Sequence, residues 1–330
     1  MIKTYHILIC RNDAIGDTVL ALPMCGVIKK YLPQTSITFL GTAYTRPVVA
    51  MCQYVDDFID YNEIKDLDTP SLQQLFKEKE IDSALLMKSD KEMAHTIKRS
   101  GIRYRIGMLT WLKHWSTCNR FVNFSRSKSN LNEAQLNLKM LTPLGIHAMM
   151  SLQELSQYYG FTKVPQLEEQ WKALLGNDKF NLILHPKTTG HGREWPLDHF
   201  TELIHQLDKN RFRIFVSGAG QDAEALKDWD VLQDKGITDL TGKMPLTQFL
   251  AFIHAADGLV AGSTGPVHLA AAFGIHALGL YTNLQSRNAN RWFPVGALGE
   301  SLECANDDMT TITVDSVLRR VNNWRKETAK

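Results

Sequence analysis

The sequence predicts an α/β protein made of two successive arrays of parallel strands and helices. Short apolar runs alternate with longer amphipathic segments, which is the pattern of β-α units. This alternation stops and begins again after Pro165. A chain of 330 residues is long enough for two domains of roughly 100–200 residues each. We therefore expect one domain over 1–165 and a second over 166–330.

The first array begins with HILIC, residues 6–10, an apolar run that suits a buried parallel strand. Residues 17–32 carry apolar side chains at helical spacing, and Pro33 ends the pattern. Further strands are expected over 36–40, 58–61 and 83–87, with a charged helix over 71–79.

The second array begins with FNLILH, residues 180–185, and Pro196 introduces a helix over 197–210. Gly274 suits the end of a later helix. Strands are expected over 212–217, 258–261 and 277–281, and helices over 222–232, 246–255, 267–273 and 314–326.

Composition narrows the class of protein. The formal charge is only +2, so the overall charge does not call for nucleic acid. No apolar run approaches the roughly 20 residues that cross a bilayer, and the first ten residues are too short for a signal peptide. Five scattered cysteines without a C-x-x-C pair argue against disulfides or zinc and for a reducing compartment. We expect a cytoplasmic globular protein.

Two such arrays suggest two Rossmann-like domains that face a central cleft. Ligands of these sheets lie beyond the carboxyl ends of the strands. This rule selects four loops, namely 11–17, 186–195, 217–222 and 261–268.

The loop 261–268, AGSTGPVH, suits a phosphate. Its small side chains leave backbone N–H groups accessible, and Ser263 and Thr264 add hydroxyl donors. Pro266 fits the first turn of the helix that follows, whose N-terminus favours an anion. Simple capping of that helix by Ser263 or Thr264 is an equally open interpretation.

The loop 186–195, PKTTGHGREW, carries Lys187, Thr188, Thr189 and Arg193. Such a cationic loop suits closure over a diphosphate, although a solvated surface loop has the same composition. The loop 217–222, SGAGQD, lacks the full dinucleotide fingerprint. We interpret it as a turn, with a ribose contact from Asp222 or Glu224 as the less favoured alternative.

The first strand is followed by Asp13 and Asp17, with Gly16 allowing a tight turn between them. Either acid suits a helix cap. The functional alternative is a general base for an acceptor hydroxyl. A helix N-terminus favours the carboxylate form. A weak base suffices where the electrophile is already cation-like, as in glycosyl transfer.

The window from Met93 to Asn132 contains no Asp or Glu. Trp111 and Trp115 lie within it. This composition suits an anionic glycolipid at a membrane face. A solvated basic face with core tryptophans is the plain alternative, and nucleic acid ranks lower because no binding motif is present. The window holds eight basic residues: Lys98, Arg99, Arg103, Arg105, Lys113, Arg120, Arg126 and Lys128.

Two residue types carry weaker signals. His268 has no second ligand at metal-binding spacing, so we expect it to contact phosphate or orient its loop. Met140, Met149 and Met150 are expected to be packing residues.

Six segments together resemble the lipopolysaccharide heptosyltransferase family, glycosyltransferase family nine. The resemblance implies a GT-B architecture whose C-terminal helix, about 314–326, crosses back to the first domain. It also implies inverting transfer of a heptose from ADP-heptose to the inner core of lipopolysaccharide, without metal or cofactor. The segments are RNDAIGDTVLALP (11–23), SGIRYRIGM (100–108), HPKTTGHGREWP (185–196), LTGKMPLTQFLAFIHAAD (240–257), AGSTGPVHLAAAFG (261–274) and CANDDMTTITVDSV (304–317).

The resemblance also implies roles for individual residues. Asp17 takes the place of the catalytic base, and Arg193 stands where a lysine is usual. The resemblance and the residue patterns described above together give the expected binding residues. We expect the first domain to bind the acceptor, through Arg11, Asp13, Arg103, Arg105, Lys113 and Arg120. We expect the second to bind the nucleotide sugar, through Lys187, Thr188, Thr189, Arg193, Asp222, Met244, Ser263, Thr264, Gly265, Pro266 and His268.

One departure leaves the donor sugar open. Many family members carry Asp where this chain has Ser263, and serine supplies no charge to a sugar or a developing cation. A related transferase with another donor or acceptor is therefore an alternative. A nucleotide-sugar epimerase, which needs no acceptor, and a non-catalytic nucleotide- or glycan-binding protein are others. A Rossmann dehydrogenase is disfavoured because the first β-α turn lacks its glycines.

Overall fold

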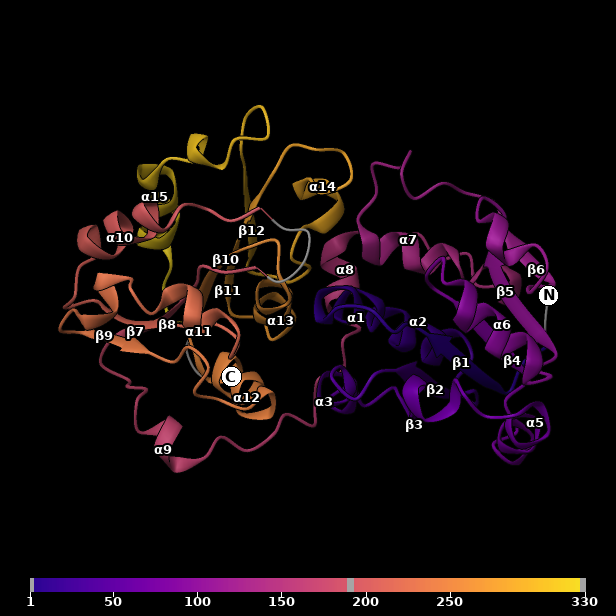
Figure 1. The fold of residues 1–330 in the computed structure, drawn as a ribbon. Helices are drawn as coiled ribbons and strands as arrows, with labels where there is room; N and C mark the ends of the chain where they lie inside the picture. The colour runs from indigo at the N-terminus through magenta and orange to yellow at the C-terminus, as the bar shows by residue number, and fades with distance from the viewer. Residues whose placement is uncertain (1–2, 189–192, 327–330) are drawn as a thin grey trace. The chain divides into compact units, whose positions relative to one another are not determined.

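The computed structural model describes residues 3–188 and 193–326 (Figure 1). The chain divides into two compact units between Lys163 and Val164, next to the boundary expected after residue 165. No helix among these described residues is long and apolar enough to cross a bilayer.

The first unit is built on a six-stranded sheet in which all strands are parallel and follow the order β3-β2-β1-β4-β5-β6. This is the doubly wound order of dinucleotide-binding domains. Strand β1 lies at the centre and is buried from Ile7 to Cys10, as its apolar run predicts. The strands are β1 His6–Cys10, β2 Ser36–Gly41, β3 Asp57–Asp60, β4 Ser83–Leu86, β5 Tyr104–Met108 and β6 Arg120–Val122.

The helices of the first unit connect these strands. They are α1 Ile15–Ala21, α2 Pro23–Tyr31, α3 Arg46–Ala50, α4 Tyr61–Ile64, α5 Thr69–Glu78, α6 Lys91–Arg99, α7 Glu133–Lys139 and α8 Leu152–Ser156, with short 3₁₀ turns η1 Leu112–His114 and η2 Thr142–Leu144.

The single helix expected over 17–32 is wrong. The segment forms α1 and α2, which meet at Leu22. Pro23 has no N–H to continue the hydrogen-bond ladder, but it suits the first turn of a new helix. Pro23 thus divides the segment into two helices, and the second of them ends at Tyr31, just before Pro33 as expected.

The second unit repeats the same topology. Its strand order is β12-β11-β10-β7-β8-β9, again with every pair parallel. The strands are β7 Phe180–His185, β8 Phe212–Val216, β9 Ile237–Asp239, β10 Gly258–Gly262, β11 His276–Tyr281 and β12 Gly299–Glu303. The helices are α9 Glu169–Lys172, α10 Leu197–Gln206, α11 Asp222–Leu226, α12 Leu246–Ala255, α13 Gly265–Ala272, α14 Ala289–Trp292 and α15 Val314–Asn323, with 3₁₀ turns η3 Asp230–Gln233 and η4 Met309–Thr311.

The expected return of the last helix to the first domain is wrong. The buried stripe of α15, formed by Val314, Val317 and Val321, packs in the core of the second unit beside α10. Trp324, directly after the helix, lies in the same core, and its indole N–H donates to Glu300 Oε1 at 2.7 Å. The helix has one apolar stripe, and this core covers it completely.

Candidate active site

The first cluster lies where the strand order of the first sheet reverses, beyond the carboxyl ends of β1 and β4. Ligands of doubly wound sheets bind at this position. The loop after β1 carries Arg11, Asn12 and Asp13, and the first turn of α1 carries Asp17. The side chain of Asn12 donates to Asp90 Oδ2 at 3.3 Å, which links this loop to the one after β4.

Arg11 is the centre of the cluster, with only 3% of its surface exposed. Its Nε lies 2.9 Å from Asp13 Oδ1, and its Nη2 donates to Asp17. Glu133 Oε1 lies 3.7 Å from the same guanidinium, and Asn137 Oδ1 accepts from it at 3.4 Å. Arg11 therefore holds Asp17 in place. Because Arg11 is buried, little of its surface is left for the contact with the acceptor that we expected.

A second buried arginine completes the cluster. Arg126 bonds to Glu133 and donates to Asn137 Oδ1 at 3.1 Å from both terminal nitrogens. We expected Arg126 on an exposed basic surface, and this expectation is wrong. The acid-free window ends at Asn132, and the next residue, Glu133, supplies the missing counter-charge.

Burial raises the pKa of Asp17, against the opposing charge of Arg11; the nearby carboxylates of Asp13 and Glu133 raise it further. We expected a weakly basic carboxylate at a helix N-terminus, and the direction of the pKa shift is opposite to this expectation. Desolvation outweighs the favourable charge of Arg11 here. A raised pKa makes Asp17 a stronger base than an ordinary aspartate.

The second cluster lies at the corresponding reversal of the second sheet, beyond β7 and β10. The loop after β7 folds against the end of β10. A methyl group placed on Gly262 would lie 3.1 Å from Thr188 Cγ2 and 3.2 Å from the backbone oxygen of Arg193. The fold thus brings 186–195 and 261–268 together, as their composition predicts. Thr189 lies outside the described residues.

Helix α13 begins directly in this cluster. Thr264 is its N-cap residue, but the side chain makes no capping hydrogen bond. Ser263, Gly265 and Pro266 are half-buried. Plain capping by Thr264, one of the two interpretations that the sequence left open, therefore receives no support. The first turn instead carries N–H groups of the kind that bind anions.

His268, on α13, is buried, and burial lowers its pKa to about 4. Its Nδ1 has no partner among the described residues. At pH 7 the ring is neutral, so it offers phosphate no positive charge in this structure.

Both cations of the loop 186–195 have acidic partners. Lys187 Nζ lies 2.5 Å from Glu194 Oε2, and Glu194 also accepts from the Thr188 N–H. Arg193 is 57% exposed and bonds to Asp307 Oδ2 at 2.8 Å. Asp307 has a positive φ of 58°, a strained conformation for a residue other than glycine.

Two further residues predicted to contact the nucleotide sugar, Asp222 and Met244, lie on neighbouring loops. Asp222 is buried and accepts from the Ala219 N–H at 2.7 Å, so it closes its own turn. Met244 is half-buried after Gly242, and the Gly242 N–H donates to the Gly218 oxygen at 3.0 Å. These two loops are thus joined to each other.

The basic window divides into structural and exposed residues. Arg99 donates to the backbone carbonyls of Leu67 and Lys65. Arg105 donates to those of Thr117 and Ile102. The exposed members are Lys98, Arg103, Lys113, Arg120 and Lys128. Trp115 is 59% exposed, and Trp111 is half-buried. The plain alternative of core tryptophans is therefore wrong for Trp115.

Sequence reasoning missed Glu133, Asn137 and Asp307. A signal existed for the first two, because they stand four residues apart and share a helix face. No local signal marks Asp307, whose partner lies 114 residues away. Among the described residues, no three His, Cys, Asp or Glu side chains are grouped as a metal site.

Comparison with known proteins fits this architecture. The sequence model of glycosyltransferase family 9 (heptosyltransferase) matches residues 70–309. One Haemophilus influenzae protein, whose name gives it only the class of glycosyltransferase, is 28% identical over 88% of this chain and 86% of its own length. The lipopolysaccharide core heptosyltransferase OpsX of the same species is 23% identical over 83% of this chain and 78% of its own.

The crystal structure of the Escherichia coli ADP-heptose lipopolysaccharide heptosyltransferase II superposes with a TM-score of 0.74 at 19% identity, over 96% of this chain and 97% of that one. The fold is therefore the GT-B fold, with two Rossmann-like domains. The family match covers well over half of the sequence. This chain belongs to glycosyltransferase family 9, the heptosyltransferases, and is a glycosyltransferase.

Proposed function

We propose that the protein transfers a heptose from ADP-heptose to the inner core of lipopolysaccharide, with inversion at the anomeric carbon and Asp17 as the general base. The observation that carries this proposal is the pair of clusters at the two strand-order reversals. One presents a carboxylate with a raised pKa, and the other presents a phosphate-binding helix terminus with cationic residues. Relatives named for the same donor and acceptor classes support it.

In the proposed reaction, the acceptor hydroxyl gives its proton to the Asp17 carboxylate. The hydroxyl oxygen attacks the anomeric carbon from the face opposite the diphosphate. The bond between that carbon and the diphosphate oxygen breaks, and ADP leaves with the electron pair. Arg193, the Thr188 hydroxyl and the first N–H groups of α13 stabilise the charge on the leaving group.

The two ion pairs of the loop 186–195 fit this role. Arg193 and Lys187 are charged and oriented before substrate arrives, because Asp307 and Glu194 hold them. A diphosphate with several oxygens can replace or share these carboxylates. Since cations and a helix terminus supply the positive charge, we propose that transfer requires no metal, so chelation with EDTA should leave the rate unchanged.

Ser263 favours one alternative within this class. The side chain is neutral and half-buried at the start of the donor loop. Many family members have a charged Asp at this position. A donor sugar that needs no charged partner beside residue 263 would therefore suit this chain. The competing function is therefore transfer of another sugar by the same two clusters.

The exposed cations of the basic window support an acidic acceptor. These five cations lie along the same stretch of the sequence as exposed apolar side chains, on the segment between β5 and β6 and its flanks. A surface of this composition suits the anionic head group of a glycolipid at the cytoplasmic face of the inner membrane. We propose peripheral contact with that membrane on this basis.

The decisive experiment is a panel of nucleotide sugars with truncated core acceptors, read by mass spectrometry. ADP-heptose with an inner-core acceptor should give the mass of one added heptose. Asp17→Asn should abolish turnover yet bind ADP as the parent does, with Asp66→Asn as the control. Product from donor alone would indicate an epimerase, and wild-type turnover in Asp17→Asn would remove Asp17 from its role.

A further inference from the structure

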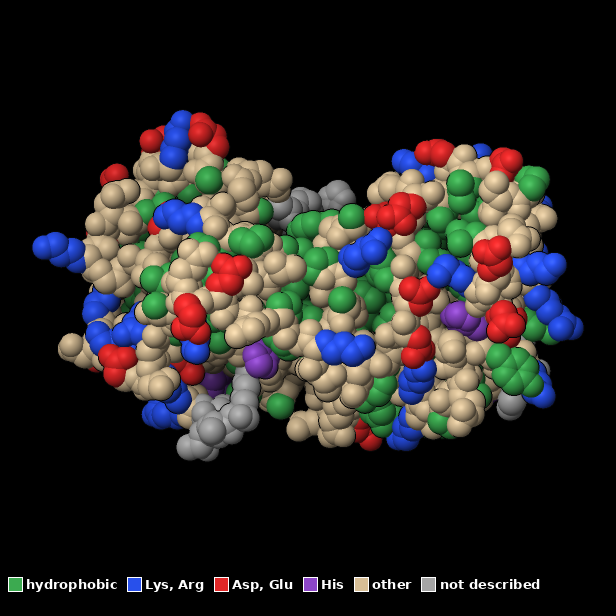
Figure 2. Space-filling view, turned by 90° about the horizontal axis from the view of Figure 1, so that it is seen from below, with side chains coloured by type: hydrophobic (Ala, Val, Ile, Leu, Met, Phe, Trp, Pro, Cys, Tyr) green, Lys and Arg blue, Asp and Glu red, His purple; other side chains and the backbone are tan. Residues whose placement is uncertain are grey.

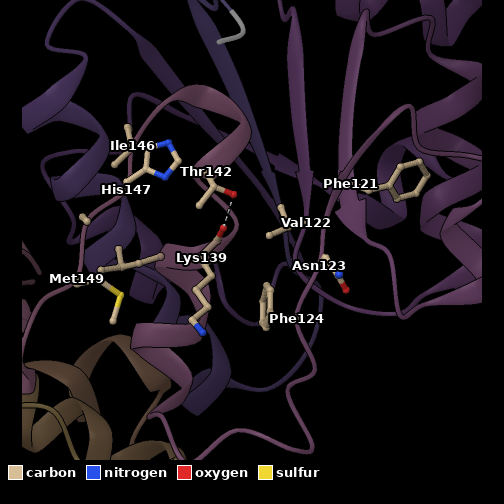
Figure 3. Close-up of a pocket in the computed structure, with 11 residues that line it drawn as sticks. Phe121, Val122, Asn123, Phe124, Lys139, Thr142, Ile146, His147 and Met149 are labelled. Atoms are coloured by element: carbon tan, nitrogen blue, oxygen red, sulfur yellow. Dashed lines mark hydrogen bonds between the residues drawn. The ribbon is translucent and has the colours of Figure 1, made fainter.

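The first unit contains a pocket that the proposed reaction does not use. It has a volume of about 410 Å³ and lies between the end of β6 and the segment that follows α7. Figure 3 shows Val122 and Phe124 on one side, Ile146, His147 and Met149 on the other, and Lys139 between them. Its walls are Phe121, Val122, Asn123, Phe124, Leu138, Lys139, Thr142, Ile146, His147, Ala148 and Met149.

The walls are chiefly apolar, with one cation placed among them. Phe124, Leu138 and Ile146 supply aromatic and aliphatic surface. The Lys139 ammonium lies 5.6 Å from the centre of the Phe124 ring, and no described acidic side chain pairs with it. No Asp or Glu lines the pocket. An apolar cavity with a single cation suits a hydrocarbon chain that carries an anionic group.

Exposed apolar side chains lie on the pocket wall and on a neighbouring segment of the chain. Met149, expected to be a packing residue, is 76% exposed on the pocket wall, and Phe121 is 38% exposed. The neighbouring segment adds Leu112, 72% exposed, and Trp115. This segment is attached to the pocket strand, because the Leu109 N–H donates to the Val122 oxygen at 2.9 Å. Clustered exposed apolar groups mark an interaction surface.

The pocket adjoins the cluster that holds Asp17. Helix α7 serves both, since Glu133 and Asn137 bind the buried arginines, whereas Leu138 and Lys139 line the pocket. The Phe124 ring lies between them, with the Arg126 guanidinium 5.7 Å from its centre. A molecule in this pocket would thus lie one helix away from the proposed base.

We propose that this pocket binds an acyl chain of the anionic glycolipid acceptor, with an anionic group of the lipid at Lys139. The proposal rests on the proposed function for the identity of the lipid. The bound acyl chain would position the acceptor through its lipid part, independently of the sugar that receives the heptose. Charge complementarity at Lys139 selects an anionic lipid over a neutral one, and the exposed apolar rim favours a molecule with a hydrocarbon chain.

The first test measures binding by the full chain with a defined probe. Dodecyl phosphate, used below its critical micelle concentration, should bind in isothermal titration calorimetry. Butyl phosphate has the head group without the chain and should not bind. Dodecyl maltoside has the chain without the charge and should bind about tenfold more weakly. Equal binding of dodecyl phosphate and dodecyl maltoside would overturn the role of Lys139.

Two variants separate the pocket from the rest of the surface. Ala148→Trp fills the cavity from a half-buried wall position and should weaken dodecyl phosphate binding at least about tenfold. Ala173→Trp adds the same indole on an exposed helix end of the other unit and should not. Lys139→Gln should weaken binding, whereas Lys77→Gln, an exposed cation on α5 outside the pocket, should leave it unchanged. Wild-type affinity in both pocket variants would overturn the proposal.

The second test asks whether the acyl chain in the pocket belongs to the acceptor or to a bilayer lipid. Ala148→Trp should raise KM for the acylated acceptor and leave KM for a deacylated acceptor unchanged. An equal effect on both would overturn the proposal. If Ala148→Trp instead lost binding to anionic phospholipid vesicles while keeping KM, the occupant would be bilayer lipid and the acceptor assignment would fail. Absence of transfer by the parent, with dodecyl phosphate still bound, would refute the proposed function alone.

Discussion

At the residue scale, the chemistry of the first cluster depends on three carboxylates that share two buried arginines. Arg11 and Arg126 share Glu133 and Asn137, and Asp13 and Asp17 complete the shell of Arg11. Burying a guanidinium is expensive unless carboxylates and amide oxygens satisfy it. The same burial that requires these partners raises the pKa of Asp17.

The pH dependence of catalysis should follow from this arrangement. Asp17 acts as a base only when ionised, so kcat/KM should fall as pH falls through its raised pKa, above the usual value of about 3.9. The Asp13 charge contributes to that elevation. Asp13→Asn should therefore lower the pKa of Asp17 and move the acid limb to lower pH. The check is a profile of kcat/KM against pH.

The matched control is Asp66→Asn, an exposed acid on the same domain. Its acid limb should coincide with that of the parent. If Asp13→Asn left the limb in place or moved it to higher pH, Asp17 would not be the titrating group.

Glu133 should be far more important for stability than a surface acid. Glu133→Gln leaves two buried guanidinium groups with one carboxylate fewer, so it should lower the free energy of unfolding by about 3 kcal/mol. Urea denaturation of the first domain would measure the loss. Glu169→Gln, which breaks the exposed pair with Lys172, should change nothing measurable. Equal effects of the two substitutions would contradict the network.

At the scale of elements, the donor cluster depends on a close approach between a loop and a strand end. Gly262 ends β10, and the loop after β7 lies against it. Gly262→Ala places a methyl group 3.1 Å from Thr188 Cγ2 and 3.2 Å from the Arg193 oxygen, so the loop must shift. Backbone oxygens yield less readily than side-chain ends. The geometry that we propose binds the diphosphate therefore depends on this glycine.

Gly262→Ala should weaken ADP binding about tenfold in isothermal titration calorimetry, because preorganised donors are displaced. Gly220→Ala provides the comparison, since an added methyl there meets no atom within 4 Å. ADP affinity should be unchanged in that variant. Unaltered ADP binding in Gly262→Ala would mean that the loop after β7 does not contact the nucleotide.

At the scale of the whole molecule, each unit has its own doubly wound sheet and its own buried core. Figure 2 shows acidic and basic side chains interspersed over the face that it draws, in keeping with a formal charge of +2. The exception along the chain is the acid-free window. The local cluster of basic residues in this window, and not the overall charge of the protein, therefore supports the proposed recognition of the acceptor.

The position of α15 gives a test of domain independence. A fragment of residues 164–330 should fold alone and bind ADP, because the apolar stripe of α15 is covered within this unit. Ending the chain at Thr313 removes Val317, Val321 and Trp324 from the core. Each such side chain contributes about 1.5–3 kcal/mol, which together approach the stability of a small domain.

Circular dichroism and calorimetric ADP titration of the two fragments would test this. The longer fragment should show cooperative unfolding, and the one ending at Thr313 should not. A longer fragment that stays unfolded would show that the second domain depends on the first.

The sequence by itself determined the alternation of β-α units, the boundary region near residue 165 and the loops that follow the strands. Apolar runs such as HILIC and FNLILH suffice for this, because a strand buried on both faces needs continuous apolar side chains. Short, half-exposed strands such as β9 and β12 escaped detection, since they lack such a run. The resemblance to glycosyltransferase family nine was confirmed by the family match.

Only the tertiary structure decided which charges are buried together and which core receives the last helix. Arg11 and Arg126 stand 115 positions apart, and Glu133 becomes their common partner only when β1, α7 and the segment after β6 meet. The stripe of α15 is apolar wherever it packs, so periodicity predicts its burial but not its neighbour. Contacts between residues so far apart in the sequence depend on the three-dimensional path of the chain, and local sequence patterns carry no information about that path.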